Sequence, residues 1–235
     1  FALVGIDQII NNAAKIRQMS GGQFPIPIVF RGPTASAGQL GATHSQAFDN
    51  WFANCPGLKV IVPSNPYDAK GLLKSAIRDD DPVIFFEHKT LYTISGDVPD
   101  GEYLVPFGKA RMVSEGDDCT LVATGRMISF CENAAQALAD DGITCDIIDP
   151  RTTSPLDEDA ILDSVEKTGR LVVVDETPPK FASAARGMSV TGDWLPPRAN
   201  GIPRFDKPPL IYWLMGLVYS IPGQETLDPL GTWAS

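Results

Sequence analysis

The chain has 235 residues, 43% of them hydrophobic, which is enough for one large or two ordinary globular domains. Its formal net charge of -10 at pH 7 would repel a polyanion, so nucleic acid is excluded as an expected partner. The four cysteines show no CxxC pairing and follow no signal peptide, which predicts reduced thiols and a cytoplasmic protein. The chain does not begin with Met, and we expect it to start inside a longer one.

The first part of the chain predicts an alternation of helices and buried strands. Apolar residues recur at helical spacing over 6–19, and Gly21 and Gly22 follow as a stop. Asn65 can cap a helix over 66–79, with Pro at its first position. Apolar runs without alternation are typical of strands buried on both faces. Such runs lie at 25–32, 58–64 and 82–88. Their order predicts parallel pairing with right-handed crossovers.

A second alternation follows a polar, turn-rich stretch over 93–107 that we interpret as an interdomain linker. Asp157 stands where a helix N-cap is expected and Gly169 where a C-cap is expected. The predicted strands of this part are 119–125, 144–150 and 170–176, and its predicted helices are 127–142 and 157–169. After Glu176 the chain becomes rich in proline. We therefore predict domains at 1–92 and 108–180, the linker between them, and a separate tail at 181–235.

His44 is the strongest candidate for chemistry, because it lies beyond the carboxyl end of a buried strand, where open α/β sheets bind ligands. The alternative is that Thr43 or Ser45 caps a helix and His44 is a surface neighbour. His88 is expected to make a hydrogen bond at a strand end. The acidic run at 78–82 is either a solvated helix exit or a site for an oxygen-seeking cation. Phosphate-binding loops, a GxSxG elbow and a transition-metal cage are not indicated.

Two segments carry a resemblance to a known family. They are "PIPIVFRGPTASAGQLGATHSQAFDNW" and "IDPRTTSPLDEDAILDSVEKTGRLVVVDETPP". Residues 1–180 closely resemble the beta subunit of the thiamine-diphosphate-dependent first component of 2-oxo acid and acetoin dehydrogenase complexes. That subunit belongs to the transketolase-like superfamily. The resemblance implies an α/β fold, with a truncated pyrimidine-binding domain built on a parallel sheet with flanking helices. An incomplete transketolase carboxyl-terminal α/β domain follows it.

The resemblance also implies a reaction and its partners. The family oxidises pyruvate or acetoin and transfers the acyl group to the lipoyl group of an acyltransferase component. Its thiamine diphosphate and Mg2+ lie between alpha and beta subunits of an α2β2 heterotetramer. The histidine matching His44 lines the channel to the thiazolium, positions the lipoyl acceptor and handles protons. The activating glutamate is expected upstream of Phe1. No cofactor-binding residue is therefore assigned in this chain, and the chain alone is expected to be inactive and poorly folded.

Family members also bind a structural potassium ion, mainly through backbone carbonyls. The resemblance places these ligands in the strand at 25–32 and at the exit of the helix at 66–79. The matching residues are Ile28, Ala76, Ile77, Asp79 and Asp81. This implication favours the cation site over the solvated helix exit.

Residues 188–223 resemble a different family, the membrane glycosyltransferases that use polyprenyl-phosphate sugars. That resemblance implies contact between Lys207 and lipid phosphate. The apolar stretch at 208–221 is too short to span a bilayer, which needs about 20 apolar residues. Three interpretations of the tail are open. It is the product of a chimeric gene or assembly, a genuine fusion whose end touches a membrane, or a segment recruited to supply the helix that closes the second domain. The first is favoured because the junction at 175–180 falls inside a predicted domain.

Overall fold

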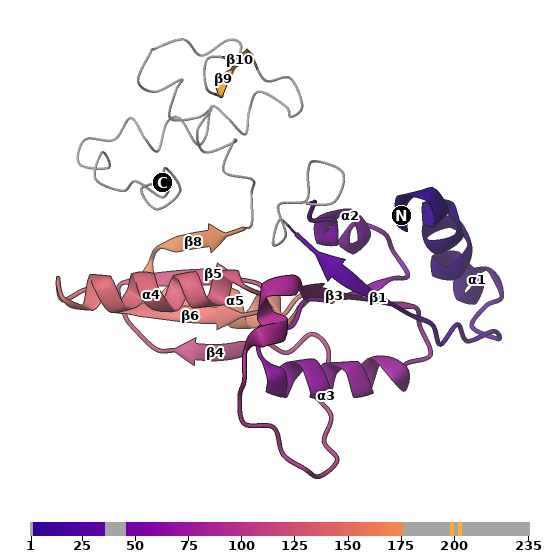
Figure 1. The fold of residues 1–235 in the computed structure, drawn as a ribbon, viewed down its shortest axis with the longest axis horizontal. Helices are drawn as coiled ribbons and strands as arrows, with labels where there is room; N and C mark the ends of the chain where they lie inside the picture. The colour runs from indigo at the N-terminus through magenta and orange to yellow at the C-terminus, as the bar shows by residue number, and fades with distance from the viewer. Residues whose placement is uncertain (1, 36–45, 176–197, 200–201, 204–235) are drawn as a thin grey trace. The chain divides into compact units, whose positions relative to one another are not determined.

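The computed structural model describes residues 2–35, 46–175, 198–199 and 202–203 (Figure 1). Phe1–Glu176 form one compact unit and Thr177–Ser235 a second. In the second unit the described residues are an antiparallel pair, β9 (Arg198–Ala199) and β10 (Ile202–Pro203). No helix within the described ranges is long and apolar enough to cross a membrane.

The first sheet has the strand order β1-β3-β2-β7. Its first three strands run parallel, as the buried apolar runs predict. The fourth, β7, comes from much later in the chain and runs antiparallel to β2, which the sequence did not indicate. The strands are β1 (Val29–Thr34), β2 (Lys59–Ile61), β3 (Val83–His88) and β7 (Thr152–Ser154).

Helices lie on both sides of this sheet. The helix predicted over 6–19 is present but irregular, since a π-helical segment precedes its last turns. The cap predicted at Asn65 is confirmed, because its side chain accepts a hydrogen bond of 2.9 Å from the Asp68 N–H. The helical segments are η1 (Ala2–Gly5), η2 (Gln8–Ala13), α1 (Ala14–Met19), α2 (Asp49–Ala53), α3 (Pro66–Ile77) and η4 (Lys89–Thr93).

The two faces of the first sheet belong to two apolar clusters. Val60 and Ile84 pack with residues of η2, α1 and α2, whereas their chain neighbours Ile61 and Phe85 pack with α3. Successive strand residues point to opposite faces, so both faces are buried and the lack of alternation is explained. Val105 is buried in the second cluster, so this part of the predicted linker packs against α3.

The second sheet has the order β4-β6-β5-β8. β6 and β8 both pair parallel with β5, as predicted, and β4 adds an antiparallel edge that was not predicted. The elements are β4 (Arg111–Ser114), β5 (Cys119–Ala123), α4 (Met127–Ala139), β6 (Cys145–Asp149), α5 (Glu158–Thr168) and β8 (Leu171–Val174).

The two ends of α5 test the predicted caps. Gly169 ends the helix in the left-handed conformation, with φ of 69°, so this C-cap prediction is confirmed. Asp157 holds the N-cap position, but its side chain makes no capping hydrogen bond. Its carboxylate instead accepts a hydrogen bond of 2.8 Å from the Ala110 N–H, which ties the approach to β4 to the start of α5. The N-cap position predicted for Asp157 is therefore confirmed, although its carboxylate binds a distant N–H and does not cap the helix.

Candidate functional site

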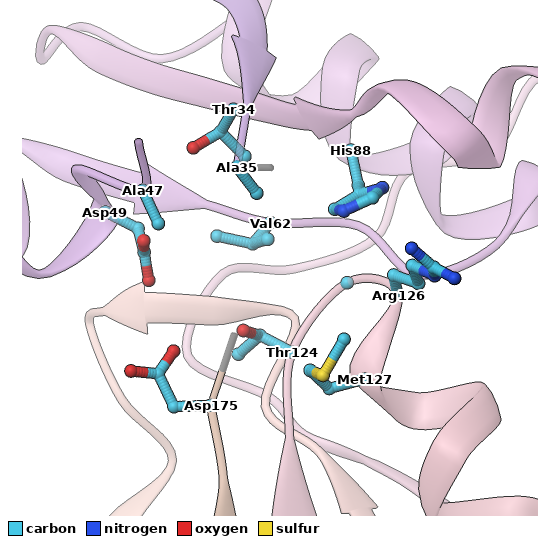
Figure 2. Close-up of a pocket in the computed structure, with 11 residues that line it drawn as sticks. Thr34, Ala35, Ala47, Asp49, Val62, His88, Thr124, Arg126, Met127 and Asp175 are labelled. Atoms are coloured by element: carbon cyan, nitrogen blue, oxygen red, sulfur yellow. The ribbon is translucent and has the colours of Figure 1, made fainter. Parts of the chain in front are cut away.

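A small cavity lies where the carboxyl ends of strands from the two sheets approach one another (Figure 2). Its interior has room of about 20 Å³, enough for one water-sized group. The ends of parallel strands are where ligands bind in open α/β sheets, so this is the place that the fold favours for a site. The lining residues are Thr34, Ala35, Ala47, Asp49, Val62, His88, Thr124, Gly125, Arg126, Met127 and Asp175.

Each sheet supplies one side of the cavity. Thr34 and His88 are the last residues of β1 and β3, and they lie opposite each other in the parallel register. Thr124 and Asp175 directly follow β5 and β8 of the second sheet. Figure 2 shows the first pair on one side of the cavity and the second pair on the other. The cavity therefore depends on both parts of the chain.

His88 is held by the residues that follow it. It is buried, and its Nδ1 lies 2.7 Å from the Thr90 hydroxyl and 3.3 Å from the Thr90 amide nitrogen. Nδ1 accepts the N–H hydrogen bond and so caps η4. The strand-end hydrogen bond predicted for His88 is confirmed. The same ring also lines the cavity, which the sequence prediction did not include.

His44 lies outside the described residues, in the interval 36–45. The two ends of that interval are fixed to each other, since the Ala35 N–H donates a hydrogen bond of 3.0 Å to the Gln46 carbonyl. Ala35 and Ala47 both line the cavity.

Two close contacts shape the wall at the start of α4. A Cβ added to Gly125, which has φ of +54°, would lie 3.2 Å from the Val62 side chain, so glycine permits the approach of β2. The Arg126 guanidinium lies 5.0 Å from the centre of the Phe130 ring, a cation–π contact that orients it. No sign of these contacts is present in the sequence, because only the fold brings Gly125 close to Val62.

A buried charge network lies behind the cavity. Arg111 of β4 reaches Asp68 of α3 at 3.4 Å and Asp149 of β6 at 3.5 Å, and both carboxylates are fully buried. Arg151 pairs with Asp68 at 2.8 Å, and its carbonyl accepts a hydrogen bond of 3.0 Å from the N–H of Val62 in the cavity wall. The network therefore fixes the first sheet to the second beside the cavity.

The predicted potassium ligands fall in two segments that meet. The Ile26 N–H donates to the Asp80 carbonyl, so the approach to β1 contacts the loop after α3. Lys59 binds both carboxylate oxygens of Asp79 at 2.7 Å and reaches Asp81 at 3.1 Å. Burial lowers the pKa of Lys59, but these hydrogen bonds outweigh it, and the net pKa is raised.

The same loop shows which groups remain for an ion. The carboxylates of Asp79 and Asp81 are engaged by protein cations. The carbonyls of Ile28 and Ala76 each accept a backbone hydrogen bond, from Val83 at 2.9 Å and from Asp79 at 3.3 Å. A carbonyl oxygen has a second lone pair, so carbonyls rather than carboxylates fit the predicted ion. In the described part of the chain, His, Cys, Asp and Glu form no group of three that could hold a metal.

Comparisons with known proteins agree with the two α/β parts. Residues 1–95 match the model of the transketolase pyrimidine-binding domain, and residues 108–194 match that of the transketolase C-terminal domain. A solved structure, a split-gene transketolase in an inactive beta4 tetramer, superposes with a TM-score of 0.56 at 22% identity. That superposition covers 72% of this chain and 54% of the other, and it supports the fold alone.

Curated relatives are more similar in sequence. The chain is 52% identical over 180 residues to the acetoin:2,6-dichlorophenolindophenol oxidoreductase subunit beta of Cupriavidus necator, covering 77% of this chain and 53% of that one. It is 46% identical to the mitochondrial pyruvate dehydrogenase E1 component subunit beta-2 of Oryza sativa subsp. japonica, with coverages of 79% and 50%. It is 47% identical to the 2-oxoisovalerate dehydrogenase subunit beta of Bacillus subtilis, with coverages of 75% and 54%. The chain spans about half the length of these relatives.

Proposed function

We propose that this chain, which belongs to the transketolase-like family, acts as the beta subunit of a thiamine-diphosphate-dependent 2-oxo acid or acetoin dehydrogenase. The observation that carries the proposal is the identity of about half of the aligned residues to such beta subunits. Pyruvate and acetoin are the proposed substrates, with acyl transfer to a lipoyl group. The relative that acts on 2-oxoisovalerate is almost as similar, so overall identity does not separate the substrates.

The proposal assigns the cofactor chemistry to a complex. Thiamine diphosphate with Mg2+ would be held jointly with an alpha subunit in an α2β2 heterotetramer, and it supplies a carbon nucleophile when bound. The strand-end cavity suits this arrangement, because it is small, lies at the strand ends of both sheets and is lined by polar side chains such as Thr34 and Thr124. This chain would enclose the reacting end of the substrate and exclude water from it.

His44 is proposed to position the lipoyl acceptor and to move a proton at one of its ring nitrogens. An imidazole suits this role because its pKa is ordinarily close to neutrality. The support is positional, since His44 precedes by three residues Ala47 in the cavity wall. The alternative, that Thr43 or Ser45 caps a helix and His44 is a bystander, stays open.

The test uses the longest form of the chain that its gene encodes, purified with its alpha subunit. We expect turnover of pyruvate or acetoin with a lipoyl acceptor, and His44→Ala should slow acyl transfer about 100-fold, the size of a lost acid–base group. Thr43→Ala is the matched control, because it removes the alternative cap and keeps the imidazole. Normal lipoyl-dependent turnover in His44→Ala would return His44 to the bystander role.

Potassium binding by the loop after α3 is a separate proposal. The carbonyls of Ile28, Ala76, Ile77, Asp79 and Asp81 would form the ring, with the carboxylates held by Lys59 and Arg17. Asp79→Ala should therefore affect potassium-dependent stability less than inserting one residue into the loop, which displaces several carbonyls together. A melting temperature that is the same in potassium and in a bulky organic cation would remove this proposal.

The remaining assignments stay proposals of the same kind. They include the lipoyl acyltransferase as partner, a cytoplasmic location, and the domain limits at 1–92 and 108–180. The resemblance of residues 188–223 to glycosyltransferases falls almost entirely outside the described residues, and the comparisons give it no support as a second function. One uninterrupted genomic read across codons 170–200 tests the chimera interpretation, and even coverage across the junction would contradict it.

A further inference from the structure

Thr34 has an unusual position in the cavity wall. It is the last residue of β1, the residue is only 9% exposed, and its hydroxyl oxygen is buried without a hydrogen-bond partner. A buried hydroxyl that makes no hydrogen bond destabilises a folded protein, because it has lost its bonds to water. Such a cost at the wall of a cavity suggests that the hydroxyl is kept for a partner that the cavity receives.

The geometry restricts what that partner is. The cavity has room of about 20 Å³, which suits one water-sized group and not a branched side chain. Thr34 is β-branched, so its χ1 angle is restricted and its hydroxyl is held in place before a ligand arrives. The next residue, Ala35, has a left-handed φ of 71°, so the strand turns away directly after Thr34 and leaves this side chain at the wall.

The other buried polar atoms without a hydrogen bond are not placed to bind a ligand in the cavity. Atoms of Asp68, Arg111 and Arg151 belong to the buried charge network and have ion-pair partners. The hydroxyl of Thr153 in β7 is also without a hydrogen-bond partner, but Thr153 does not line the cavity. Thr34 alone in this group combines an unsatisfied hydroxyl with a place in the cavity wall.

We propose that Thr34 is a substrate-contacting residue whose hydroxyl donates a hydrogen bond to the carbonyl or hydroxyl oxygen of a short 2-oxo acid or hydroxy ketone. This inference rests on the proposed function. It adds a determinant of specificity on the first sheet, opposite the residues that follow β5 and β8.

The test compares Thr34→Val and Thr34→Ser with the unchanged chain, each in complex with the alpha subunit and assayed with pyruvate and with acetoin. Thr34→Val keeps the shape and removes the hydroxyl. We expect it to raise KM about 10-fold with little change in kcat, because the hydrogen bond is made in both the bound substrate and the transition state. Thr34→Ser keeps the hydroxyl and should recover most of the lost affinity.

The melting temperature gives a second readout, in which Thr34→Val should improve the protein although it weakens substrate binding. Because Thr34→Val removes an unsatisfied polar atom, the melting temperature of the ligand-free protein should rise while KM worsens. Thr153→Val is the matched control, since it removes a similar hydroxyl away from the cavity and should leave KM unchanged. A structural role for Thr34 would instead lower the melting temperature in Thr34→Val.

The outcomes separate this inference from the function on which it rests. An unchanged complex that turns over neither pyruvate nor acetoin contradicts the proposed function. An active complex in which Thr34→Val has the original KM, or in which the melting temperature falls, overturns the role of Thr34 and leaves the proposed function standing.

Discussion

The two ends of β6 carry buried aspartates with different surroundings. At the amino end, Asp146 accepts hydrogen bonds from the Lys167 ammonium at 2.8 Å, the Gly116 N–H at 2.8 Å and the Ser164 hydroxyl at 2.5 Å. At the carboxyl end, Asp149 accepts hydrogen bonds from the Ser64 hydroxyl and, at 2.9 Å, from the Arg151 N–H. Its cation, Arg111, lies 3.5 Å away and is shared with Asp68.

These differences set the two pKa values in opposite directions. Burial raises the pKa of Asp146, but the hydrogen bonds from Lys167, Ser164 and Gly116 outweigh it, and the net pKa is lowered. Burial also raises the pKa of Asp149, and there the hydrogen bonds do not compensate, so the net pKa is raised. Asp146 lies at the amino end of β6, whereas Asp149 lies two residues before Arg151, whose carbonyl binds the N–H of Val62 in the cavity wall.

The carboxyl end of β6 is also the end with a restricted backbone. Arg151 has a left-handed φ of 63°, which is uncommon for a residue other than glycine. Its carbonyl holds the N–H of Val62 in the cavity wall. Two unfavourable features, the raised pKa of Asp149 and the left-handed backbone of Arg151, therefore lie at the end of β6 that contacts the cavity wall through Val62. Backbone strain is commonly retained at functional sites.

The largest expected effect comes from Gly116→Ala, which disrupts the surroundings of Asp146 at the amino end of β6. A Cβ at this position would lie 2.2 Å from the backbone nitrogen of Cys145, and backbone atoms cannot move aside as a flexible side chain can. The substitution also displaces the N–H that binds Asp146. We expect a loss of about 4 kcal/mol in the free energy of unfolding, measured by urea denaturation. Gly101→Ala is the control, because a Cβ there meets nothing within 4 Å, and equal stability of the two variants would refute this account.

Asp146→Ala should have the next largest effect. It leaves Ser164 and the Gly116 N–H without their acceptor, and we expect a loss of about 3 kcal/mol at pH 7. Because the folded pKa of Asp146 is lowered, its contribution is present above the unfolded pKa and is lost as pH falls through the folded pKa. Denaturation curves of the variant and the unchanged chain should therefore converge in acid. The exposed Asp141→Ala serves as control, and a gap that widens in acid would contradict the assignment.

Asp149→Asn should have the smallest effect, about 1 kcal/mol or less at neutral pH, because the ionised form is already disfavoured. The contribution of Asp149 to the free energy of unfolding changes with pH in the opposite direction to that of Asp146. The folded pKa is raised, so the cost of the charge is present above that pKa and is relieved as pH falls through it towards the unfolded value. The unchanged chain should thus gain stability relative to Asp149→Asn over that interval. A loss larger than that of Asp146→Ala would show that the two ends do not differ as described.

Features specified by local sequence were predicted well. The Asn65 cap, the left-handed Gly169 and the burial of β2 and β3 on both faces each depend on residues close together in the chain, and each is confirmed. The same burial predicted for 25–32 was wrong, because β1 has exposed residues and only its last residue, Thr34, is buried. β4 and β7 were missed because they are short and have no apolar alternation, and their pairing depends on partners elsewhere in the chain. Asp157 holds the predicted N-cap position, but the sequence did not show that its carboxylate binds the N–H of the distant Ala110.

The candidate site could be predicted only by its location. The rule that ligands bind at the carboxyl ends of parallel strands correctly directed attention to the end of β1. It could not single out Thr34, Thr124 or Asp175, which are ordinary polar residues at strand ends and become neighbours only when both sheets have formed. The signal at Thr34 is a buried hydroxyl that makes no hydrogen bond, and such a signal exists only in three dimensions.

The position of β7 has a consequence for how the chain can be divided. β7 follows β6 of the second sheet in sequence, yet it pairs with β2 and forms an edge of the first sheet. A protease cut or a gene split within 93–107 would therefore not yield two independent modules. The amino-terminal fragment would lack an edge strand that the other fragment carries, and we expect the two pieces to co-purify and to refold only together, as complementing fragments do.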